Sequence, residues 1–84
     1  MLLHIGGETS VKSKEIIAII DIRTGAQSAA TREFLELVKD QNMLVDISTG
    51  DAKSLVVTQY RTYLSPISAV TLGRRANAVP EKVS

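Results

Sequence analysis

His4 is the only histidine in the chain, and its side chain is the one with the widest range of possible chemistry. A serine or cysteine nucleophile needs a neighbouring base, which is usually a histidine. The chain has no cysteine, and one histidine among scattered carboxylates supplies too few ligands for a transition metal. Because His4 lies inside a short apolar segment, a structural position on a strand is the simpler interpretation. We expect no catalytic centre and no metal site, unless a cleft brings His4 beside a buried carboxylate.

Carboxylates recur at helical spacing at Glu33, Glu36 and Asp40. A buried carboxylate pair can do acid–base chemistry, but these residues alternate with Arg32 and Lys39, as on a solvated helix face. The glycines lack the spacing of a phosphate-binding loop or a dinucleotide fingerprint. We therefore predict that the protein is not an enzyme and binds no cofactor.

Basic side chains are the remaining candidates, because they can contact the phosphates of double-stranded DNA. The candidates are Lys12, Lys14, Lys53, Arg61, Arg74 and Arg75. Ten Lys and Arg residues against nine Asp and Glu give a net charge of only +1, so DNA binding would depend on local clustering. If the last four candidates share one continuous face, DNA binding is favoured. If they are scattered or neutralised, a protein partner is favoured.

The first part of the chain predicts strands separated by short turns. Leu2–Ile5 is expected to form a strand, Gly6-Gly7 a turn and Glu8–Val11 the returning strand. Ser13–Glu15 has the composition of a single helical turn. The β-branched residues of Ile16–Ile22 indicate a strand at the centre of a sheet.

A helix is predicted over Ala30–Gln41, after a loop at 23–27, because apolar residues recur there at intervals of three and four. Its apolar stripe holds Ala30, Phe34, Leu37, Val38 and Gln41. Either Ser28 or Thr31 is a plausible N-cap, and Asn42 can end the helix in the left-handed conformation.

Three further strands and a second helix complete the expected fold. The strands are Met43–Ile47, Lys53–Tyr60 and Tyr63–Ser65, with Arg61-Thr62 as a turn. The helix covers Pro66–Ala76, with Ser65 or Ser68 as its cap and with Ile67, Val70 and Leu72 facing inward. The pattern predicts an α+β fold, a small mixed or antiparallel sheet with one or two helices on one face. We expect one domain over residues 1–76 and a loose C-terminal tail over 77–84.

The chain is short, with 84 residues, and has no disulfide to stabilise it. Its two most apolar strands therefore predict that copies associate with one another. No segment has the length or the charge pattern of a signal peptide or a membrane span. We expect a cytoplasmic protein without a membrane partner.

The order of these segments resembles the RemB-like (YaaB) extracellular matrix regulatory proteins and their RemA relatives. The matching segments are Leu3–Gly7, Val11, Ile16–Ile22, Met43–Asp46, Gly50, Ser54–Thr58, Tyr63–Ser68, Thr71-Leu72 and Arg74–Ala76. The resemblance implies a fold similar to the LytTR DNA-binding domain and a ring-shaped homo-oligomer. It also implies transcriptional regulation of matrix and biofilm genes by DNA binding.

The sequence departs from the RemA pattern at three positions. RemA-like proteins carry an arginine before the long apolar strand and an arginine pair after the glycine of the central loop. Here these places hold Glu15, Asp51 and Ala52. Acidic side chains repel phosphate, so the fold and the oligomer are better supported than direct DNA binding. The alternative is an oligomeric structural or protein-interaction module, whose partner could be another regulator.

Overall fold

The computed structural model describes residues 1–25 and 28–78, which form short strands and helices in the order expected from the sequence. The elements are β1 (Leu2–Gly6), β2 (Thr9–Lys12), a 3-10 turn η1 (Ser13–Glu15), β3 (Ile16–Asp21), α1 (Ile22–Gly25), α2 (Ala29–Asp40), β4 (Leu44–Asp46), β5 (Ser54–Thr58), β6 (Thr62–Ser65) and α3 (Ala69–Ala78). None of the helices in this part of the chain is long and apolar enough to cross a membrane.

The strands form two sheets. β1 and β2 make an antiparallel hairpin, and the other strands form a four-stranded sheet in the order β3-β5-β6-β4. β5 is antiparallel to both β3 and β6, whereas β4 runs parallel to β6. The predicted α+β class with a mixed sheet is therefore confirmed.

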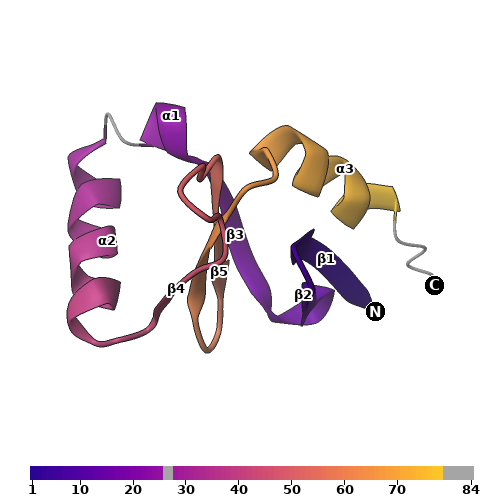
Figure 1. Cartoon of the computed structure of the whole chain (residues 1–84), viewed down its shortest axis with the longest axis horizontal. Coiled ribbons are helices and arrows are strands. Elements are labelled where there is room, and N and C mark those ends of the chain that lie inside the picture. The colour runs from indigo at the N-terminus through magenta and orange to yellow at the C-terminus, as the bar shows by residue number, and fades with distance from the viewer. Residues whose placement is uncertain (26–27, 79–84) are drawn as a thin grey trace.

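The two longer helices cover opposite faces of the four-stranded sheet, not one face as the sequence suggested (Figure 1). Alternation along β5 sends Val56 toward the hairpin and α3, and sends Val57 toward α2. The main core joins Leu3, Val56 and Leu72 with their buried neighbours in the hairpin. Ile16 and Ile19 of β3 also pack against this core, and α3 contacts β3.

The predicted central position of β3 is wrong. Among the described residues, β3 pairs only with β5 and forms one edge of the sheet. The two inner strands are β5 and β6, and Leu55 and Val56 of β5 are fully buried. A register shift between Ile16 and Ala18 leaves Ile17 as the extra residue of a β-bulge. Ile17 is 66% exposed. A run of β-branched residues indicates a strand, but it carries no information about the order of strands in a sheet.

The capping residues in the sequence predicted both ends of α2 closely. The Ser28 hydroxyl accepts a hydrogen bond from the Thr31 backbone N–H at 3.4 Å, as an N-cap does. Asn42 has a φ of 58°, the predicted left-handed stop. Leu37 and Gln41 are nevertheless exposed, because α2 packs chiefly against β4 at one side of the sheet. The loop predicted at 23–27 begins instead with the short helix α1, and residues 26–27 lie outside the described residues.

The C-terminal helix begins later than predicted, at Ala69. The Ser68 hydroxyl, not that of Ser65, accepts a hydrogen bond from the Thr71 backbone N–H at 3.2 Å. Val70 is consequently turned outward rather than into the core. α3 continues through Ala78, two residues into the segment that the sequence assigned to the tail, and residues 79–84 lie outside the described residues.

Gly6 is where the hairpin meets the segment before α3. It has a φ of +143°, and a Cβ built there would lie 2.7 Å from Cδ of Pro66. We expect Gly6→Ala to lower the free energy of unfolding by about 2–3 kcal/mol, through strain and overpacking. The matched control is Gly73→Ala in α3, where a Cβ meets nothing within 4 Å. That variant should be stabilised by up to about 1 kcal/mol. Urea unfolding measures the free energy of unfolding of both variants. Equal changes in the two variants would contradict a special role of Gly6 in the backbone.

Candidate functional site

The basic residues predicted to contact DNA come from several elements and from both ends of the four-stranded sheet. Lys53 directly precedes β5 and Arg61 follows it, so the five residues of the strand separate them by roughly 17 Å. Both side chains are exposed. Of the four residues expected to gather, these two lie at opposite ends of the sheet.

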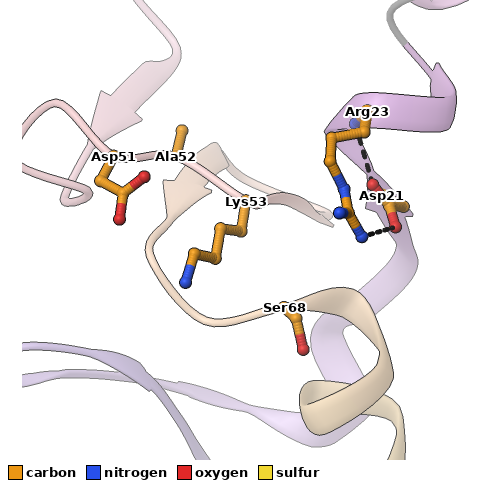
Figure 2. A pocket seen from close by; sticks show the side chains of 6 residues that line it. All are labelled: Asp21, Arg23, Asp51, Ala52, Lys53 and Ser68. Carbon is orange, nitrogen blue, oxygen red and sulfur yellow. Dashed lines mark hydrogen bonds and ion pairs between the residues drawn. The ribbon is translucent and has the colours of Figure 1, made fainter.

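Lys53 lies beside an open cleft of about 350 Å³ between the central loop and the start of α3. Asp21, Arg23, Asp51 and Ser68 also line this cleft. Figure 2 shows Lys53 extending into the space between Asp51 and Ser68, whereas Arg23 turns toward Asp21. The Arg23 guanidinium lies 3.6 Å from the Asp21 carboxylate, which also accepts a hydrogen bond from the Arg23 backbone N–H. The cleft therefore carries charges of both signs.

Arg61 closes the tight turn at the other end of the sheet. Its carbonyl accepts hydrogen bonds from the Thr58 backbone N–H at 2.9 Å and the Thr58 hydroxyl at 2.7 Å. The backbone N–H of Gln59 donates to the Glu15 carbonyl, which holds η1 and the exposed Lys14 beside this turn. Glu15 thus lies at the Arg61 end of the sheet, and Asp51 lies at the Lys53 end. Each end combines basic groups with an acidic one.

The other predicted residues lie on the hairpin side of the sheet. Lys12 ends β2 and is paired with Leu2 of β1. Arg74 and Arg75 are exposed on α3, and the Arg75 guanidinium contacts His4. The sequence did not indicate this contact, because it joins residues that are 71 positions apart.

His4 lies next to groups that do not support acid–base catalysis. Its ring nitrogens contact the Gly7 carbonyl and the Arg75 guanidinium, and neither is a carboxylate. The carboxylates of Glu33, Glu36 and Asp40 are exposed along α2, as expected for a solvated face. In residues 1–25 and 28–78, no three His, Asp or Glu side chains are grouped so that they could hold a metal ion.

Asp46 orders the start of the central loop. Its carboxylate accepts hydrogen bonds from the Ser48 hydroxyl and, at 2.9 Å, from the Ser48 backbone N–H. These two bonds hold the pKa of the Asp46 carboxyl below its usual range, the hydroxyl contributing most. The start of the loop after β4 is thus fixed by the Asp46 side chain. Thr49 and Gly50 follow with positive φ and lead to the cleft.

An apolar groove that the sequence did not predict runs between α2 and β3. We call it the β3-side groove, and its volume is about 200 Å³. Its apolar lining is Ile17, Phe34, Val38, Met43, Val57 and Tyr60, and its polar lining is Thr58, Gln59, Arg61 and Thr62. Tyr60 is 62% exposed, Met43 is partly exposed, and Leu37 adds an exposed apolar side chain one helical turn from Phe34. The only signal in the sequence was the excess of isoleucine in a strand with one covered face.

A second apolar groove lies on the other flank of α2. We call it the β4-side groove, and its volume is about 290 Å³. Leu35, Leu44 and Leu64 form its apolar lining, and the charged residues Arg32, Glu36 and Lys39 of α2 line it as well. The two grooves lie toward opposite edges of the same sheet face, because β3 and β4 are the two edge strands. The described surface thus carries two separate grooves with apolar side chains in their lining.

Fold and surface together define a small α+β protein whose exposed features suit contacts with macromolecules. The family model described as RemA-like, extracellular matrix regulatory protein A-like, matches residues 2–76, and the chain belongs to this family. The chain is also 36% identical over 76 residues to extracellular matrix regulatory protein B of Bacillus subtilis (strain 168), a match that covers 90% of each chain. The resemblance inferred from the order of segments is confirmed.

Proposed function

We propose that the protein is a cytoplasmic regulator of matrix and biofilm genes that acts as a ring-like homo-oligomer and contacts DNA. Membership of the RemA-like family supports the regulatory role, because the family and the Bacillus relative are both named extracellular matrix regulatory proteins. The uncovered β3-side groove is the observation that supports assembly into an oligomer. A small soluble domain rarely leaves a cluster of large apolar side chains in water unless a partner covers it.

The edge strand β3 adds to this argument. Soluble proteins usually protect an edge strand with lysine, proline or a covering element. Five of the six β3 residues are aliphatic, and the only charge is Asp21 at the end. The bulge at Ile17 is the one protective feature. A second copy that covers this strand and the groove would bury the exposed Ile17 and Tyr60.

Assembly would also compensate for the modest charge. One copy has a net charge of +1, and each end of its sheet carries both signs. A ring repeats each basic group once per copy, so that weak phosphate contacts act together on DNA that spans several copies. Lys12, Lys14, Lys53, Arg61, Arg74 and Arg75 are the side chains that we propose for these contacts.

A second candidate function is an oligomeric protein-interaction module that does not bind DNA. The positions of Lys53 and Arg61 at opposite ends of β5 favour it, because one copy cannot present both to the same short stretch of phosphates. Glu15 and Asp51, which lie at these same ends, favour it as well.

Mobility-shift titration of duplex DNA from upstream of matrix genes distinguishes the two functions, provided that sedimentation shows the assembled protein. We expect a shift at low salt that weakens steeply as salt rises, because counterion release drives such binding. A double variant, Lys53→Gln with Arg61→Gln, should flatten the salt dependence. An assembled oligomer that gives no shift even at low salt would exclude direct DNA binding and leave the interaction module.

A further inference from the structure

Arg75 of α3 and His4 of β1 form a contact that the proposed function does not explain. Nη1 of Arg75 lies 3.4 Å from Nδ1 of His4 and donates to the His4 carbonyl at 3.2 Å. On its other side, the imidazole places Nε2 2.8 Å from the Gly7 carbonyl. The ring is thus held between the β1–β2 turn and α3, and all these groups are on the surface.

The geometry fixes the protonation pattern of the ring. The Gly7 carbonyl can only accept, so Nε2 of His4 must carry a hydrogen. The guanidinium of Arg75 can only donate, so Nδ1 must offer its lone pair. Only the neutral imidazole with its hydrogen on Nε2 satisfies both neighbours.

A protonated imidazole would not fit this arrangement. Both ring nitrogens would then donate, and Nδ1–H would face a guanidinium N–H across 3.4 Å, with one positive charge on each group. The groups that face His4 from the other elements are Ser10 of the opposite strand, Arg74 and Arg75 of α3, and the exposed Glu8 of the turn. The hydrogen bonds of the ring within the described residues involve no carboxylate. An anion between the two cations would relieve the repulsion.

We propose that His4 and Arg75 form a proton-linked phosphate-binding site. With neutral His4, Nδ1 of the imidazole faces the guanidinium as an acceptor. Proton uptake turns Nδ1 into a donor, and the imidazolium and the guanidinium then bind one phosphate group between them. Binding and proton uptake are reciprocal, so phosphate must also favour the protonated ring.

The phosphate can belong to the DNA backbone or to a free phosphate. The DNA case rests on the proposed function, whereas the free-phosphate case does not. Inorganic phosphate and a DNA duplex are therefore separate arms of the test. Phosphate binding without DNA binding would support this site and reject the proposed DNA contact.

The test uses long-range ¹H–¹⁵N spectra of His4 in the full-length protein, which report the protonation of each ring nitrogen. At about pH 8 we expect a hydrogen on Nε2 and none on Nδ1. Inorganic phosphate itself gains a proton between about pH 8 and pH 5.5, so its binding is compared between the wild type and His4→Gln at each pH. The ratio of the wild-type affinity to the variant affinity should rise as the pH falls, by at most about tenfold per unit, because His4 takes up one proton. A hydrogen on Nδ1 at the higher pH, or a ratio that does not change with pH, would overturn the proposal.

Variants identify the groups responsible. His4→Gln should keep only the pH dependence that comes from phosphate itself, because it keeps a side chain able to donate to Gly7 and retains every other titrating group. Arg75→Gln should weaken phosphate binding at the lower pH. Lys39→Gln removes the same charge from α2, on the other face of the sheet, and should leave the pH dependence as in the wild type. If His4→Gln keeps the wild-type pH dependence, His4 is not the linked group and the proposal fails. In the DNA arm, the same variant should remove the pH dependence of duplex binding.

Discussion

Ile17→Glu should convert the assembled protein into monomers. The substitution removes an apolar side chain that the proposed contact buries, at a cost of about 2–3 kcal/mol, and it adds a carboxylate without a partner. Together these effects correspond to at least about a 100-fold weaker contact between copies. Sedimentation velocity at micromolar concentration measures the change directly. Because Ile17 is an exposed bulge residue, the isolated fold should keep its stability.

Val70→Glu is the matched control for this prediction. Val70 is also β-branched, is 62% exposed, and lies on α3 on the other face of the sheet. It should leave the oligomer intact. Equal dissociation by both variants would mean that any added charge disrupts assembly. A wild-type protein that sediments as a monomer would reject self-association itself, whereas an Ile17→Glu variant that stays assembled would reject only the β3-side groove.

A ring makes a stricter demand, because each copy must use two different surfaces. The β3-side and β4-side grooves are the two candidates. If one copy's β3-side groove meets its neighbour's β4-side groove, Ile17→Glu and Leu44→Glu each damage one half of the same contact. A mixture of the two variants should then form one-to-one dimers. In each dimer the intact β4-side groove of the Ile17→Glu copy meets the intact β3-side groove of the Leu44→Glu copy. A symmetric contact of one groove with itself would give no such rescue.

Much of the local structure could be predicted because its causes are local. Ser28 and Asn42 bound α2 through side-chain capping and a left-handed backbone, which need only near neighbours. The β1–β2 hairpin was likewise predicted from short apolar segments on either side of the Gly6-Gly7 turn. The order of strands could not be predicted, because β3 pairs with a strand more than thirty residues further along. An edge strand and a central strand built from isoleucine have the same sequence pattern.

The separation of the basic residues could have been predicted from the sequence. The strand expected over Lys53–Tyr60 already placed Lys53 and Arg61 at its two ends, and the extended geometry of a strand keeps them apart. The His4–Arg75 contact could not have been predicted, because it depends on how α3 lies against the hairpin. The bulge that exposes Ile17 could not have been predicted either, since no glycine or proline marks it.

Asp51→Arg should increase the affinity for DNA. The resemblance to RemA places an arginine pair directly after the glycine of the central loop, where this chain has Asp51 and Ala52. Asp51 is exposed, and its backbone N–H, not its side chain, bonds the loop through the Ser48 carbonyl. The substitution raises the charge by two units per copy next to Lys53. We expect about tenfold tighter binding at low salt and a salt dependence steeper by about one unit for each new phosphate contact.

Glu33→Arg makes the same charge change on the exposed face of α2 and serves as the control. An equal gain from both variants would show that overall charge, not the loop, determines binding. No gain from Asp51→Arg in an intact oligomer would show that the central loop faces away from DNA. If only Asp51→Arg increases the affinity for DNA, the central loop approaches the phosphates. In the wild type, Asp51 would then weaken a DNA contact at a place where the fold still holds the loop next to DNA. Lys53 would then be the residue on which the wild-type contact at this end of the sheet depends, because it is the cation that extends into the cleft beside that loop (Figure 2).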